Sequence, residues 1–241
     1  MAVGSGGDDG TARGYGAARR AWRCVTLGGC GLFGGNSYRF RLAVAVDTPE
    51  GPRTGSGVLE VRASNEWSPL PDMADRSWEV RGEAVAVDLP GGRTLFALLK
   101  TDAHFEDMMG LSMNTLHPDF RGTGYNVVGV AGELSRRWGG EPVAVAPADY
   151  PLLVTFGDLD DPASVRLVEP GDLAAQFGSG TALRGITAEL TDAAVTRGID
   201  ERLGWLGKHP EPRLDNDFMP TPNPTFAQQI RHGDFARGTI G

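Results

Sequence analysis

The 241-residue sequence contains little lysine, little cysteine and no long apolar run. Lys100 and Lys208 are the only lysines, so arginine carries almost all of the positive charge. Because no stretch of about 18 apolar residues occurs, the sequence predicts no helix that spans a bilayer. The formal net charge is -8 at pH 7, and an acidic chain is poorly suited to bind nucleic-acid phosphates, so no nucleic-acid partner is expected.

The two cysteines, Cys24 and Cys30, both lie in the N-terminal part of the chain. The tetrapeptide Leu27-Gly28-Gly29-Cys30 is typical of a lipobox, in which small residues precede a cysteine that receives lipid. Cleavage before Cys30 would remove Cys24, and the remaining chain could then form no disulfide. We therefore predict that Cys30 is a lipid attachment site that tethers the protein to a membrane.

The residues upstream of Cys30 have only part of the features of an export signal. Positive charge comes from Arg13, Arg19, Arg20 and Arg23. The apolar core at residues 21–27 is short and contains Arg23, whereas a secretory signal has about 7 to 15 apolar residues there. Either the start codon is misassigned or the signal has decayed. The predicted location is the periplasmic side of a membrane in the cell envelope, and the alternative is a cytoplasmic protein with residues 1–35 as a disordered tail.

The clearest strand pattern in the chain lies at residues 38–47. Its apolar residues occupy every second position: Tyr38, Phe40, Leu42, Val44 and Val46. Such alternation predicts a strand with one buried face. Residues 48–52 contain proline and glycine and predict a turn, after which residues 57–62 return as the second strand of a hairpin.

A second hairpin is predicted from residues 78–87 and 94–99. The two segments flank Gly91-Gly92, which is a strong local turn signal. The apolar phase shifts across Gly82, so a bulge or a bend is expected there. Without it, a one-residue slip would expose the apolar face of the strand.

The second half of the chain predicts short strands and helices. Strands are expected at residues 142–146, 152–156, 165–168 and 184–190. Residues 105–116 predict a short helix or a loop that packs on the sheet, and residues 172–177 predict a short helix. Residues 125–134 fit a strand or a helix, and their β-branched side chains favour a strand. The apolar spacing at residues 191–206 predicts an amphipathic helix.

These elements predict an α+β fold, mainly an antiparallel β-sheet built from hairpins with a few flanking helices. Residues 1–29 form a signal-like or disordered segment, and residues 30–207 form the β-rich domain. After Lys208 the chain contains five prolines before Phe226, which predicts that residues 208–241 form an extended C-terminal arm.

The densest group of potential metal ligands lies at residues 102–119. It contains two histidines and four carboxylates: Asp102, His104, Glu106, Asp107, His117 and Asp119. Histidine and carboxylate side chains bind divalent metals where they converge, and the candidate ligands are Asp102, His104, His117 and Asp119. The spacing of the two histidines matches no common ligand motif. A polar loop without a catalytic role is therefore favoured over a metal site, and no cofactor is predicted.

Several segments resemble a family of uncharacterised bacterial proteins, many of which begin with a lipoprotein signal that ends in Gly-Cys-Gly. The resemblance rests on residues 38–42, 47–51, 55–62, 82–88, 151–156, 158–162, 165–168 and 195–199. It spans most of residues 30–206 and implies a folded, membrane-attached protein. It implies no activity and no catalytic residues.

The sequence as a whole predicts a non-enzymatic, membrane-anchored envelope protein that binds an unknown partner protein or a small molecule. The prediction rests on the Cys30 motif and on the hairpin-rich first half of the chain. The alternative from a different class is a metal-dependent hydrolase that uses His104, His117 and the neighbouring carboxylates.

Overall fold

The computed structural model describes residues 35–65, 76–101, 107–123, 126–137, 139–207, 209–215 and 222–239. The chain divides into the units Met1–Leu32 and Phe33–Gly241, and every described residue belongs to the second unit. The predicted lipobox with Cys30 therefore lies outside the described residues.

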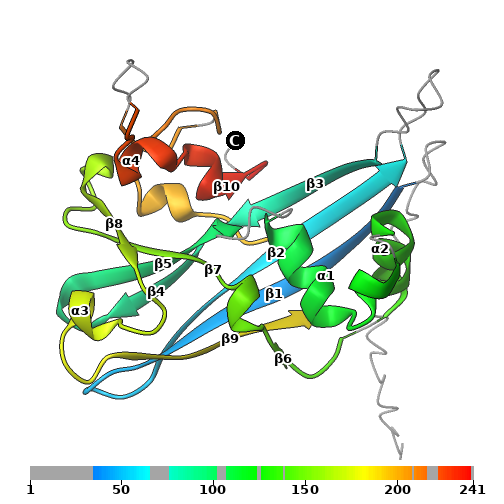
Figure 1. The fold of residues 1–241 in the computed structure, drawn as a ribbon, viewed down its shortest axis with the longest axis horizontal. Coiled ribbons are helices and arrows are strands. Elements are labelled where there is room, and N and C mark those ends of the chain that lie inside the picture. Colours follow the sequence, from blue (N-terminus) through cyan, green and yellow to red (C-terminus); the bar gives the residue numbers. More distant parts are fainter. Residues whose placement is uncertain are drawn as a thin grey trace, which may run out of the picture. The chain divides into compact units, whose positions relative to one another are not determined.

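Two antiparallel sheets and a few short helices make up the described part of the chain (Figure 1). The six-stranded sheet has the order β10-β3-β2-β1-β9-β6, with β1 at Gly35–Asp47, β2 at Arg53–Asn65, β3 at Arg76–Glu83, β6 at Val143–Ala144, β9 at Ala182–Leu190 and β10 at Ala236–Arg237. The four-stranded sheet has the order β4-β5-β7-β8, with β4 at Val85–Leu89, β5 at Arg93–Thr101, β7 at Pro151–Phe156 and β8 at Val165–Val168. The predicted α+β, mainly β class is confirmed.

The first hairpin forms as predicted. β1 and β2 pair antiparallel along their length, with Phe40 opposite Leu59. The five alternating apolar side chains of β1 are all buried, because successive side chains of a strand point to opposite faces and these five face the core formed with the other sheet and the helices. In the turn, Gly51 has a φ of 112°, and its N–H donates to the Thr48 carbonyl at 2.9 Å.

The prediction of a second hairpin is correct in its later part and wrong in its first strand. β4 and β5 pair across the predicted Gly-Gly turn. β3, however, pairs with β2 in the other sheet, so that Val80 lies opposite Val61. The chain changes sheet at Ala84, shortly after Gly82, whose φ of 148° suits glycine. The bend expected at Gly82 is therefore a passage from one sheet to the other.

Two helices cover part of the six-stranded sheet: α1 at Asp107–Leu116 and α2 at Val127–Arg136. α1 is the helix expected as one of two options, whereas the strand favoured for residues 125–134 is wrong. α2 contacts β1 and β2 through residues at helical spacing: Val127, Val130, Ala131 and Leu134. The Asn126 side chain accepts the Gly129 N–H at 3.0 Å and caps the helix, so periodic burial and capping outweigh the β-branched composition.

The amphipathic helix predicted at residues 191–206 is also wrong. The segment runs from β9 to the edge of β2, where the Thr196 N–H donates to the Val58 carbonyl at 3.1 Å. The Val58 N–H in turn donates to the Thr196 hydroxyl at 2.8 Å. Gly198 has a φ of 110°, which no α-helix contains, and only a 3-10 helix at Ile199–Glu201 follows.

The remaining elements are short. Of the strand predicted at residues 142–146, two residues form β6 and pair with β9, and the Val145 N–H also donates to the Ile186 carbonyl of β9 at 2.9 Å. The helix predicted at residues 172–177 is present as α3 at Ala174–Phe177, and the Asp172 carboxylate accepts the Ala175 N–H at 3.1 Å. α4 at Phe226–Gln229 lies in the C-terminal part, beside β8.

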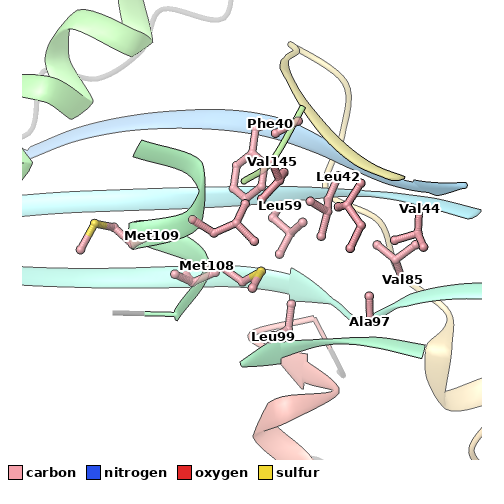
Figure 2. Packing of buried hydrophobic residues seen from close by; sticks show 14 of the residues in the cluster. Phe40, Leu42, Val44, Leu59, Val85, Ala97, Leu99, Met108, Met109 and Val145 are labelled. Carbon is pink, nitrogen blue, oxygen red and sulfur yellow. The ribbon is translucent and has the colours of Figure 1, made fainter. Parts of the chain in front are cut away.

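Strand β5 separates two hydrophobic cores. Leu95, Ala97 and Leu99 point into the core between the two sheets, where Figure 2 shows Ala97 and Leu99 facing Leu42 and Val44 of β1. The alternate residues of β5, Phe96 and Leu98, belong to the second core. A strand with two buried faces carries a continuous apolar run, as β5 does at residues 95–99.

The second core lies between the four-stranded sheet and the C-terminal part of the chain. It is closed by apolar residues that follow β9: Ile199, Leu203, Leu206, Leu214, Ala227, Ile230 and Phe235. The described part of the predicted C-terminal arm therefore packs against the sheet and contributes both α4 and β10.

We expect Gly55→Ala to destabilise the fold strongly. A Cβ at Gly55 would lie 2.0 Å from the Ala86 carbonyl oxygen of β4, so β2 and β4 would have to separate. The predicted loss is about 3 kcal/mol of the free energy of unfolding, measured by urea denaturation. Gly185→Ala in β9 is the control, because a Cβ there meets nothing within 4 Å. Equal losses in the two variants would contradict the close contact between β2 and β4.

Candidate functional site

The structure describes part of the predicted metal-ligand group. Asp102 and His104 lie outside the described residues. His117 follows α1, and its Nε2 lies 3.0 Å from Oε2 of Glu133 on α2. Asp119 is exposed. Among the described residues, no group of three or more His, Cys, Asp or Glu side chains is arranged to hold a metal ion. The metal site that would involve His104 stays a prediction.

Asp107, also part of that group, has contacts that stabilise the fold. Its φ of 44° is unusual for a residue other than glycine. One carboxylate oxygen accepts the Thr101 N–H at 3.2 Å, and the other lies 3.5 Å from the Arg237 guanidinium. Asp107 therefore joins the end of β5 to the start of α1 and to β10.

A cavity of about 480 Å³ lies between β3 and the C-terminal part of the chain. We call it the Trp78 cavity. It is lined by Trp78, Glu79, Val80, Pro210, Glu211, Arg231, Gly233, Asp234, Arg237 and Gly238. It therefore combines an indole, an aliphatic side chain, two guanidinium groups and three carboxylates.

Main-chain hydrogen bonds fix the C-terminal wall of the Trp78 cavity. The Gly233 N–H donates to the Pro210 carbonyl at 2.9 Å, and the Leu214 N–H donates to the Ile230 carbonyl at 3.0 Å. A Cβ at Gly233 would lie 2.7 Å from the Pro210 Cβ, so the two stretches are in close contact. The wall is thus preorganised before any ligand arrives.

Asp234 is the buried carboxylate of this wall. Burial raises its pKa above the usual value, and the Arg231 N–H that it accepts at 2.9 Å opposes the rise. The positive charges of Lys100 and Arg237 also oppose it. Arg237 holds this part of the wall together, because its Nε donates to the Gly233 carbonyl at 2.9 Å and its guanidinium lies 3.8 Å from Asp234.

Three groups at the Trp78 cavity remain open to a ligand: the Trp78 indole, the Arg231 guanidinium and the Glu211 carboxylate, which is exposed and forms no ion pair among the described residues. The Trp78 side chain is 39% exposed, although it shares a face of β3 with the buried Val80. The Arg231 side chain is exposed and forms no ion pair within the described part of the chain. An exposed indole beside an unpaired guanidinium suits a ligand with an apolar part and an acidic group.

A second cavity, of about 400 Å³, lies near the start of β1 and the end of α2. Its buried carboxylate, Glu60, is already paired with Arg39 at 3.5 Å and with Arg62 at 2.8 Å. The Arg39 guanidinium also donates to the carbonyls of Asp192 and Ala193, both at 3.3 Å. These contacts hold residues 191–193 against β1, so this cavity offers fewer free groups than the Trp78 cavity.

Sequence reasoning did not find the Trp78 cavity. It assigned residues 78–87 to a hairpin strand, and in the structure Trp78 lies on the same face of β3 as the buried Val80 but stays partly exposed. The remaining lining residues lie more than 100 positions further along the chain, in the segment predicted to be an extended arm. No local pattern links the two regions.

In the described part of the chain, no helix has the length and apolar character needed to cross a membrane. Comparisons with protein-family models, with curated proteins and with solved structures find no match to this chain.

We expect Asp234→Asn to change how stability depends on pH. Because the folded pKa of Asp234 is raised, the folded state binds more protons than the unfolded state once the pH exceeds the unfolded value of 3.8. The wild type should therefore lose stability relative to the variant as the pH rises from about 3 to about 7. Urea denaturation of both proteins across this range measures the difference. A difference independent of pH would contradict the raised pKa.

Proposed function

We propose that this chain is a binding protein held on the periplasmic side of a cell-envelope membrane by a lipid on Cys30, and that the Trp78 cavity is its binding site. The observation that carries the binding role is that an exposed Trp78 indole and an exposed Arg231 guanidinium line the same cavity, whose C-terminal wall is preorganised. An aromatic ring provides a large rigid contact area, and a guanidinium adds directional hydrogen bonds to an acidic group.

The proposed anchor rests on the lipobox at residues 27–30 and on the resemblance to lipoproteins that end their signal in Gly-Cys-Gly. A single acyl chain binds a membrane only marginally, so stable attachment needs more than one chain. The anchor would hold the Trp78 cavity close to partners in the envelope.

We expect Cys30→Ala to abolish membrane attachment. The wild-type chain, expressed from its native gene in a bacterial host, should partition into detergent and have a mass that reflects loss of residues 1–29 and gain of acyl chains. The variant should stay in the aqueous phase and lack the acyl mass. Cys24→Ala is the matched control and should leave attachment unchanged, because cleavage removes that residue. A wild-type product of full mass in the aqueous phase would overturn the proposed anchor.

We expect a ligand or partner at the Trp78 cavity to be captured in living cells. Glu211→p-benzoylphenylalanine places a photoreactive group at the rim of the cavity, and Leu167→p-benzoylphenylalanine places it on the exposed side of β8 as a control. Ultraviolet light should produce an adduct from position 211 and none from position 167, detected by intact mass. Adding Trp78→Ala should remove the adduct. Equal adducts from both positions, or none from position 211, would overturn the binding role of the cavity.

A further inference from the structure

Strand β3 has an open edge next to the Trp78 cavity. On one side β3 pairs with β2 from Arg76 to Arg81. On the other side β10 pairs only with Gly82 and Glu83 (Figure 1). Within the described residues, the main chain of residues 77–81 has no hydrogen-bond partner on that side. Because β3 pairs with β2 on its other side, the N–H and C=O groups of every second residue in this stretch point to the open side and are available to another strand.

The Trp78 cavity follows this open edge. Trp78, Glu79 and Val80 are consecutive residues of β3, and all three line the cavity. Successive side chains of a strand point to opposite faces of the sheet, so a cavity lined by three in a row borders the edge of the strand. The cavity thus occupies the position in which a neighbouring strand would lie.

Strand β10 ends before it reaches the part of β3 that borders the cavity. Arg237 lies opposite Gly82, and the next residue, Gly238, has a φ of 65°. A left-handed residue cannot continue a strand, so the backbone turns away after two paired residues. Gly238 also lines the cavity, which therefore begins where β10 stops.

We propose that the edge of β3 at residues 77–81 binds an extended peptide segment of a partner protein, which adds a strand to the six-stranded sheet in line with β10. The inference rests on the proposed binding function and names its ligand class. Main-chain hydrogen bonds to β3 provide the pairing, and alternate side chains of the peptide provide the specificity.

The lining of the cavity specifies the chemistry of the peptide. On the face shared by Trp78 and Val80, an apolar side chain of the peptide contacts the indole. Arg231 at the rim pairs with an acidic side chain or with a terminal carboxylate of the peptide. On the opposite face Glu79 and Arg81 are already paired with each other at 3.0 Å, so they leave no unpaired charge to repel an incoming strand.

A small molecule fits this surface less well than a peptide. The edge offers a row of main-chain donors and acceptors along residues 77–81, and only another extended backbone has matching groups at the same spacing. A second copy of this chain could pair through the same edge, and the experiment below separates that case from a partner peptide.

Selection of random decapeptides displayed on phage against the full-length chain tests the proposal. The enriched peptides should have apolar residues at alternate positions and at least one acidic group. Synthetic versions should bind Trp78→Ala at least about tenfold more weakly than the wild type. Leu167→Ala removes a comparably exposed apolar side chain from β8 and should leave the affinity unchanged.

Methylation of single peptide nitrogens then identifies the binding mode without altering the protein. An N-methyl group removes a main-chain donor, so methylation at every second residue should weaken binding at least about tenfold, and methylation at the intervening residues by less than about twofold. Hydrogen exchange should slow, when the peptide binds, at those N–H groups of residues 77–81 that point away from β2.

Four results would overturn the proposal: no enrichment above that on Trp78→Ala, equal affinity for wild type and Trp78→Ala, no alternation in the N-methyl series, or a wild-type dimer that Trp78→Lys dissociates. If cells yield the photo-adduct from position 211 while no peptide pairs with β3, the binding function stands and the peptide inference fails. If no photo-adduct forms, the proposed function fails whatever the peptides do.

Discussion

The fold depends on how Glu83 and Ala84 are held where the chain passes from one sheet to the other. The buried Glu83 carboxylate accepts the N–H groups of Gly198 at 3.2 Å and Ile199 at 3.0 Å. The Ala84 N–H donates to the Phe235 carbonyl at 2.7 Å. A buried carboxylate or N–H without such partners would cost several kcal/mol, roughly the whole margin of stability of a small domain. Three segments that are distant in the sequence therefore have to meet at this point.

The same passage determines the wall of the Trp78 cavity. The Phe235 carbonyl accepts the Ala84 N–H at the passage. The Phe235 ring packs against the rings of Phe96 and Phe156, with centroid distances of 6.0 Å and 5.8 Å. Phe235 thus connects the main chain of the six-stranded sheet to the core under the four-stranded sheet. Asp234 and Arg237 lie within two residues of Phe235 and line the cavity. The packing of Phe235 in the core therefore fixes the position of both side chains.

The sequence predicts those parts of the fold that local periodicity decides. β1 and β2 follow from strict alternation and a turn with proline and glycine, and their pairing needs no distant contact. Most of the failures involve tertiary contacts, whereas α2 was missed although its apolar spacing and its Asn126 cap are both local. The passage at Glu83 and Ala84 depends on two N–H donors and one carbonyl acceptor more than 100 residues away, and Gly198 adopts its positive φ where the Glu83 carboxylate accepts its N–H. Tertiary contacts also bring together β3 and the C-terminal segment that line the Trp78 cavity. No spacing in the sequence indicates that these two segments are neighbours.

The four terminal strands of the two sheets, β10, β6, β4 and β8, help to explain why β3 is the receptive one. The main chain of β4 is covered by β2, because the Ala86 carbonyl lies directly against Gly55. β10 and β6 are each only two residues long, and short edge strands resist pairing with other chains. β8 presents the exposed Arg166 and lies beside α4. β3 has eight residues, an exposed indole, and charges that neutralise each other within the strand. An edge that is long, apolar at one position and free of net charge lacks the usual protection against added strands. A sheet that protects its other edges and leaves this one open beside a cavity is organised to receive a strand there.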